Sequence, residues 1–254
     1  RVRHDIHHEF TNTHKDPNAI RSSLSLPGSI KQNKFKRELY FWLVASTWIW
    51  QYYTPSLQGV NVQKRHPFTI FDFQLAESIR YWVYRFLPYV GFHFALLPFM
   101  FAPLGISCVL QVLITRLIAD IFMNIYMFAV GITNHIGEDL YKFDEQPESK
   151  GEWYLQQILS TTSFASPNGF TDYLHCYMNF QIEHHLMPTL PPSKYREAKP
   201  YIQHICLKHK IPYAEDNILD RFWKTRKVFL GLGKMKTYVR QSKIRETTLR
   251  DTVS

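Results

Sequence analysis

Residues 86–115 read FLPYVGFHFALLPFMFAPLGISCVLQVLIT and contain no Asp, Glu, Lys or Arg. Pro98, Pro103 and Gly105 interrupt this stretch and favour a break between two helices. A helix that crosses the hydrocarbon core of a bilayer needs about 20 apolar residues, and apolar character continues to Val130. The pattern therefore predicts a membrane hairpin, with helices over 84–101 and 104–125, in an all-α integral membrane protein.

The second predicted helix becomes more polar along its length. Arg116, Asp120 and Asn124 are spaced by four residues, which places them on one face of a helix. This face is expected if the helix leaves the bilayer and runs under a polar site. Packing of the same stripe against neighbouring helices is the alternative.

Upstream of the hairpin, residues 39–53 (LYFWLVASTWIWQYY) are uncharged and rich in Trp and Tyr. The stretch is short for a span, and Trp and Tyr favour the membrane interface. We expect it to lie in the interface without crossing.

Two histidine motifs of matching geometry flank the hairpin. His4, His7 and His8 form HxxHH, and Gln181, His184 and His185 repeat the spacing within NFQIEHH. Positions i, i+3 and i+4 share one face of a helix, so each motif points its imidazoles in one direction, and Glu183 points away. Prolines at 188, 191 and 192 must end the second helix just after its histidines. The two motifs predict one shared metal site, which requires an even number of membrane crossings between them.

Four further residues are candidates for the same site. His135, in TNHIGED directly after the hairpin, is predicted to be a ligand. His175 is either a ligand, a support for one or a packing residue. Asn134 and Asp172 are predicted to accept hydrogen bonds from ligating histidines, which usually donate their second N–H to an oxygen. Imidazole suits iron, zinc or copper, so the ligands leave the metal and the reaction open.

Composition narrows the functional class. The net charge is +9 and 45% of the residues are hydrophobic, with Lys and Arg concentrated near the ends of the chain. No pattern of interleaved basic and aromatic residues indicates nucleic-acid binding, so the charge fits the cytoplasmic side of a membrane protein. The three cysteines have no metal-ligand spacing, and the metal chemistry must therefore be cysteine-free.

The segment NFQIEHHLMPTLPPSKY (179–195) resembles the front-end fatty acid desaturases, whose last histidine box begins with Gln. HDIHHEFTN (4–12) is similar to that family's second box, and TNHI (133–136) and STT (160–162) recur there in this order. The resemblance implies two non-haem irons bound by His4, His7, His8, His135, His184 and His185. It places Gln181 near the site rather than among the ligands. The role of His175 is less secure, because it matches a histidine in only some subfamilies.

The family's fold is four membrane helices under a cytosolic histidine-rich cap, and this chain resembles only part of it. The first histidine box, the first membrane hairpin and the b-type cytochrome domain often fused upstream have no counterpart in residues 1–254. The whole chain is therefore expected to be the C-terminal part of a desaturase domain, inactive if expressed alone.

The resemblance also implies an activity and its partners. Such enzymes use O2 and electrons from a b-type cytochrome or ferredoxin to place a cis double bond in a fatty acyl chain, carried as acyl-CoA or acyl-lipid. In a eukaryote the expected location is the endoplasmic reticulum membrane. A sphingolipid desaturase and a lipid hydroxylase remain alternatives on the same scaffold. A histidine-rich metal transporter is an alternative of another class, against which the uncharged stretch 86–115 argues.

Overall fold

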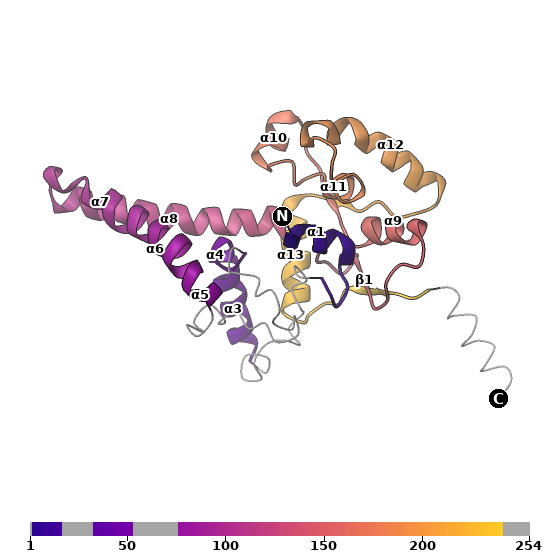
Figure 1. Ribbon diagram of the computed structural model, residues 1–254, viewed down its shortest axis with the longest axis horizontal. Coiled ribbons are helices and arrows are strands. Elements are labelled where there is room, and N and C mark those ends of the chain that lie inside the picture. Colours follow the sequence, from indigo (N-terminus) through magenta and orange to yellow (C-terminus); the bar gives the residue numbers. More distant parts are fainter. Residues whose placement is uncertain (1, 17–32, 53–75, 241–254) are drawn as a thin grey trace. The chain divides into compact units, whose positions relative to one another are not determined.

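The computed structural model describes residues 2–16, 33–52 and 76–240, which are mostly helical (Figure 1). The chain divides into two compact units. We call Arg1–Lys34 with Val130–Ser254 the histidine unit, and Phe35–Ala129 the hairpin unit. The predicted helical class is confirmed, although two pairs of very short strands accompany the helices.

Two long helical stretches form the hairpin (Figure 1). The first, Ile79–Leu104, begins within α5 (Ala76–Tyr81) and includes α6 (Leu87–Val90) and α7 (Leu97–Phe99). The second is α8 (Ile106–Gly131), and Gly105 between them has a φ of 99°, a conformation that glycine adopts without strain. At about 1.5 Å per residue, 26 residues reach roughly 39 Å, enough to cross a hydrocarbon core of about 30 Å.

The predicted hairpin is present, but its helices extend beyond the predicted bounds of 84–101 and 104–125. Pro88 and Pro98 do not end the first helix, because each lies at the start of a short α-helical segment that follows a π-helical one. The π-helical segments are η4 (Trp82–Phe86) and η5 (Gly91–Leu96). A wider turn before each proline accommodates the missing N–H donor. The 3-10 turn η6 (Ala102–Leu104) then ends the helix.

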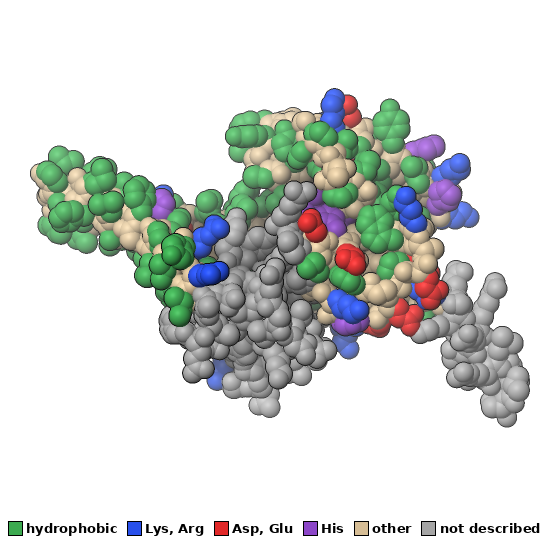
Figure 2. Space-filling model, viewed as in Figure 1, with side chains coloured by type: hydrophobic (Ala, Val, Ile, Leu, Met, Phe, Trp, Pro, Cys, Tyr) green, Lys and Arg blue, Asp and Glu red, His purple; other side chains and the backbone are tan. Residues whose placement is uncertain are grey.

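The surface of the hairpin is apolar over most of its length, as the green side chains in Figure 2 show. In the most apolar windows of the two helices, 6% and none of the residues are buried, so these are not the core helices of a water-soluble domain. Exposed apolar surface on this scale is unfavourable in water and favourable in lipid. Two candidate membrane spans are thus present among the described residues.

The polar stripe on α8 contacts the neighbouring helices of its own unit. Tyr89 donates a hydrogen bond of 2.6 Å to Asp120, and an Arg116 nitrogen lies 3.0 Å from Nδ1 of His93. Asn124 accepts from the backbone N–H of Ile49. These contacts fit the packing interpretation of the stripe, because hydrogen bonds between polar side chains help to hold membrane helices together.

Residues 39–53 do not form one helix. α3 (Lys34–Ser46) covers their first part and α4 (Trp48–Tyr52) the second. Phe41 on α3 and Trp48 on α4 both pack edge-on against Phe128 of α8. Neither helix is among the candidate spans, and their location at the interface stays a prediction.

The histidine unit is built from short helices joined by two parallel strand pairs. Its helices are α1 (Val2–Phe10), α9 (Lys150–Leu159), α10 (Gly169–Leu174), α11 (Gln181–Leu186), α12 (Tyr195–Lys208) and α13 (Ile218–Phe229). The 3-10 turn η7 (Pro192–Lys194) precedes α12. Strand β1 (Tyr141–Phe143) pairs with β4 (Lys236–Tyr238), and β2 (Ser163–Phe164) pairs with β3 (Glu215–Asp216). A core of Ile158, Ile182, Ile202 and Cys206 joins α9, α11 and α12.

Candidate metal centre

Helices α1 and α11 present the two histidine motifs. α1 carries His4, His7 and His8 on one face, and the latter two are buried. α11 begins at Gln181 and ends at Leu186, immediately after its histidines, because Pro188 follows. The predicted helical geometry of both motifs is therefore confirmed.

Six imidazoles meet in two groups of three. His4, His8 and His184 form one group, which we call cluster A. His7, His135 and His185 form the other, cluster B. Within each group one ring nitrogen from every residue lies within 4.8 Å of the others. Each cluster thus combines the two distant motifs, and the lone His135 completes cluster B.

The spacing of the ring nitrogens in cluster A suits a shared cation. Nε2 of His184 lies 3.0 Å from Nε2 of His8 and 3.2 Å from Nε2 of His4. An imidazole nitrogen binds an ion such as Zn²⁺ at about 2.0–2.1 Å, so two nitrogens on one ion are roughly 3 Å apart. In cluster B, one buried ring nitrogen each of His135 and His185 has no hydrogen-bond partner among the described residues. Such atoms need a partner, and a metal ion fits both observations.

The outer ring nitrogens of three candidate ligands face oxygen atoms. Nδ1 of His7 lies 2.8 Å from an Asp16 carboxylate oxygen. Nδ1 of His184 lies 3.0 Å from the Tyr195 hydroxyl, and Nδ1 of His185 lies 2.8 Å from Oε1 of Gln157. Metal-binding histidines commonly have this arrangement, in which the second nitrogen is fixed by an oxygen and the first is left for the metal.

Burial sets the protonation state of these rings. Desolvation, followed by the neighbouring His184 and His4, lowers the pKa of His8 to about 3. Desolvation and His4 lower the pKa of His184 to about 4, and the pKa values of His135 and His185 are also well below the usual range. Close imidazoles cannot all carry charge in a dry site, so these rings are neutral at pH 7, the form that binds metals.

The loop that carries His135 is held by α13. Arg221 is fully buried and donates to the backbone carbonyls of Thr133, at 3.2 Å, and Ile136, at 3.0 Å. It also forms two bonds, of 2.7 and 2.8 Å, to the Asp139 carboxylate. A Cβ at Gly137 would clash with this guanidinium, so a residue without a side chain is needed there.

The sequence assigns a less certain role than that of the six histidines to Gln181, Asn134, Asp172 and His175. Of these four residues, only Gln181 contacts a cluster. Its amide nitrogen lies 3.1 Å from Nε2 of His135. The amide nitrogen of Asn134 instead donates to the carbonyls of Val130 and Met178, while its Oδ1 accepts no hydrogen bond from any described residue. The predicted histidine contact is therefore not made, because this side chain ties the end of α8 to the turn before α11.

The structure also places Asp172 and His175 outside both clusters. Asp172 binds Arg196 and Asn179 and so joins α10 to α12 instead of supporting a histidine. His175 caps the end of α10, packs near Phe164 and does not share a helix with His184. Neither cluster, among the described residues, includes it.

Sequence reasoning missed Asp16, Gln157 and Tyr195, which contact the candidate ligands. Each lies outside the helix that carries the histidine it contacts, so no helical spacing connects the two. Gln157 lies three residues before the STT segment, and that proximity was the one signal available.

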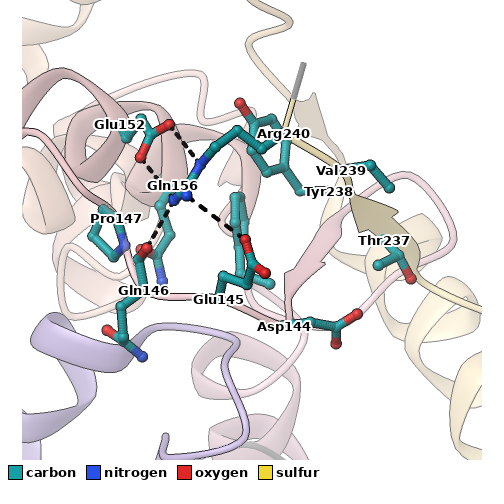
Figure 3. A pocket seen from close by; sticks show the side chains of 11 residues that line it. Asp144, Glu145, Gln146, Pro147, Glu152, Gln156, Thr237, Tyr238, Val239 and Arg240 are labelled. Atoms are coloured by element: carbon teal, nitrogen blue, oxygen red, sulfur yellow. Dashed lines mark hydrogen bonds and ion pairs between the residues drawn. The ribbon is translucent and has the colours of Figure 1, made fainter. Parts of the chain in front are cut away.

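A separate cavity of about 150 Å³ lies between the 143–147 loop, α9 and the segment after β4 (Figure 3). Arg240 reaches across it to Glu145, Glu148 and Glu152. None of the described residues that line this cavity is a histidine, and it is therefore distinct from clusters A and B. The ion pair between Arg240 and Glu152 links the segment after β4 to α9, the helix that carries Gln157.

Comparisons with known proteins identify the family. The family described as "Fatty acid desaturase" matches residues 1–217. The chain is 27% identical to human "Fatty acid desaturase 3" over 223 residues, which are 83% of this chain and 44% of that protein. It is 28% identical over 133 residues to the "NADPH-dependent stearoyl-CoA 9-desaturase" of Mycobacterium tuberculosis strain H37Rv, covering 51% of this chain and 31% of that protein. It is 34% identical over 80 residues to "Delta(8)-fatty-acid desaturase 1" of Arabidopsis thaliana, covering 32% and 17%.

No solved structure matches the chain. The chain spans less than half the length of the curated relatives named above. The match to the family nevertheless covers most of its residues, including both histidine motifs and His135. This chain belongs to the fatty acid desaturase family.

Proposed function

We propose that this chain forms part of an oxygen-dependent fatty acyl desaturase with a histidine-bound di-iron centre. The observation that carries the proposal is the convergence of six imidazoles in two clusters of three. Cluster A would hold one iron and cluster B the other. The names of the relatives, which refer to fatty acids and stearoyl-CoA, support an acyl substrate.

The side chains of this protein would bind, orient and enclose the metal ions. Bound iron would supply the oxidising power needed to break an unactivated methylene C–H bond. Two hydrogens leave adjacent carbons of the acyl chain, and O2 with two electrons and two protons from outside accepts them as two waters. Asp16, Tyr195 and Gln157 fix the rings of His7, His184 and His185 so that one nitrogen of each faces its cluster.

The surroundings of the enzyme follow from the same assignment. The full fold would be four membrane helices with the histidine unit as a cytosolic cap, of which this chain supplies the second hairpin and the cap. Its electron donor would be a b-type cytochrome or a ferredoxin, and its location in a eukaryote the endoplasmic reticulum membrane. The Gln at position 181 favours the front-end type.

Expression of the complete gene in yeast supplied with candidate fatty acids tests this function. We expect a new unsaturated product by gas chromatography, absent from the empty-vector control and from a His184→Ala variant present at the same level. His204→Ala, on α12 and in neither cluster, should leave the product unchanged. A product profile equal to the empty vector for all acyl substrates would contradict acyl desaturation, and a product only from sphingoid bases would move the assignment to a sphingolipid desaturase.

A further inference from the structure

Gln157 lies on the buried end of α9, where one oxygen atom meets both histidine motifs. Its side chain is fully buried. Oε1 lies 2.8 Å from Nδ1 of His185 and 2.9 Å from the hydroxyl of Thr11. Thr11 follows α1 directly, and its hydroxyl is also 2.8 Å from the carbonyl oxygen of His7. A single amide thus connects the end of the first motif with the last ligand of the second.

We propose that Gln157 is a positioning residue of the metal centre, whose carbonyl oxygen holds His185 with Nε2 directed at cluster B and fixes α11 against the end of α1. The inference rests on the proposed function, since it concerns how the metal ligands are arranged. It adds a residue outside the histidine motifs to the set on which metal binding depends.

The chemistry of the contact determines which nitrogen of His185 can bind a metal. A carbonyl oxygen only accepts hydrogen bonds, so Nδ1 of His185 must carry the proton. Nε2 then keeps its lone pair, and this buried atom has no hydrogen-bond partner in the part of the chain that the structure describes. If the amide were reversed, its NH2 group would donate to Nδ1, and Nε2 would carry the proton instead. Metal binding through Nε2 therefore requires the amide orientation that the structure has.

The neighbouring Gln156 provides a matched control. It lies on the same helix, is equally buried, and its amide nitrogen donates to the backbone carbonyl of Thr11 at 2.8 Å. Its hydrogen bond goes to this backbone carbonyl and, within the described part of the chain, none goes to a histidine. Substitutions at 156 therefore reproduce the loss of a buried amide and of a contact with Thr11, while the contact with His185 stays intact.

The experiment measures metal content in the protein expressed from its complete gene and purified in detergent. Wild type, Gln156→Leu, Gln157→Leu, Gln157→Met and Gln157→Glu are compared for iron per chain by mass spectrometry. Cobalt-loaded samples are compared by absorption spectroscopy, and circular dichroism verifies folding. Methionine approximates the length of Gln without its amide, and glutamate retains an acceptor whichever way the group turns.

We expect two irons per chain in the wild type, Gln156→Leu and Gln157→Glu. Gln157→Leu and Gln157→Met should retain about one, with the lost ion bound roughly 10–100-fold more weakly in chelator competition. The cobalt spectrum of the remaining ion in cluster A should be unchanged. Because only one of the two ions is lost, this result separates positioning of His185 from general instability.

Two results would overturn the proposal. One is a folded Gln157→Leu or Gln157→Met protein that binds both ions as tightly as wild type. The other is a Gln157→Glu protein that loses the same ion as Gln157→Leu, which would mean that the amide donor matters and not the acceptor. A folded wild type without bound metal would instead contradict the di-iron function.

Discussion

Glu183 stands directly before the two histidines of α11 and points away from them, as the helical spacing predicts. Its carboxylate is fully buried and accepts hydrogen bonds from Tyr213, at 2.5 Å, and Ser163, at 3.0 Å. The residue therefore anchors the back of α11 to β2 and to the segment before β3. Its contribution concerns the stability of the helix that presents His184 and His185, since it touches neither imidazole.

Replacing Glu183 with Ala should lower the thermal unfolding midpoint by several degrees. Two hydroxyl donors would lose their partner in the interior, and each buried unsatisfied group costs about 1–3 kcal/mol. In a protein of this size, 1 kcal/mol corresponds to roughly 2–4 °C. The midpoint is followed by tryptophan fluorescence in detergent. Glu197→Ala, which removes an exposed ion pair with Lys194, is the control and should change little; equal midpoints for the two variants would refute the anchoring role.

At the residue scale, the sequence predicts which histidines come together better than it predicts the residues that contact them. His4, His7 and His8 were identifiable because a helix imposes a fixed spacing on neighbours in the chain. Asp16, Gln157 and Tyr195 were not, because their contacts with histidines depend on how separate elements pack. The same limit explains Asp172, whose partner Arg196 comes from another helix.

Among the elements, α13 is the one that holds the His135 loop, and it begins just beyond the residues that match the family. Burial by itself would raise the pKa of Asp139, but Arg221 and Lys224 outweigh it and leave the pKa below its usual range. The ion pairs are 2.7 Å and 2.9 Å long. A carboxylate whose pKa is lowered by folding stabilises the protein above its unfolded pKa, about 3.9, and loses that effect as the pH falls through the folded value.

The Asp139 carboxylate should therefore stabilise the protein near neutral pH and not at low pH, and the Asp139→Asn variant should lack this pH dependence. At pH 6–7 we expect the variant to unfold at a lower temperature than wild type. The difference should shrink as the pH falls below about 4, where the carboxylate of the unfolded chain becomes protonated, and should vanish once the pH is below the lowered pKa of the folded carboxylate. Midpoints measured from pH 3 to 7 check this, with Asp144→Asn, an exposed carboxylate in the same segment, as the control. A difference between wild type and Asp139→Asn that is constant across this range would contradict the assignment.

The sequence predicts which helices form better than it predicts the residues at which they begin and end. The hairpin follows from uncharged residues 86–115, but its helices run longer than predicted because π-helical turns absorb Pro88 and Pro98. The strands β1 to β4 have only two or three residues each, too few for a period-two pattern to reveal them. Their pairing partners are also distant in the chain, so nothing local indicates them.

For the whole molecule, the candidate site restricts how the chain crosses a membrane. His4, His7 and His8 precede the hairpin, whereas His135, His184 and His185 follow it. Side chains that share one cluster must lie on one side of the bilayer, and an even number of spans returns the chain to that side. The two spans Ile79–Leu104 and α8 satisfy this condition, provided that residues 39–53 do not cross.

Cysteine labelling in sealed microsomes tests this topology. In a background without the three native cysteines, single cysteines replace Glu9 next to the first motif, Lys194 after the second, and Leu104 at the hairpin turn; all three side chains are exposed. A membrane-impermeant maleimide should label positions 9 and 194 in intact vesicles, because the proposed topology places both on the cytosolic side. Position 104 should react only after the vesicles are lysed, because the turn lies on the other side. Opposite accessibility of positions 9 and 194 would place the two motifs on different faces of the membrane, and no shared metal centre could then form.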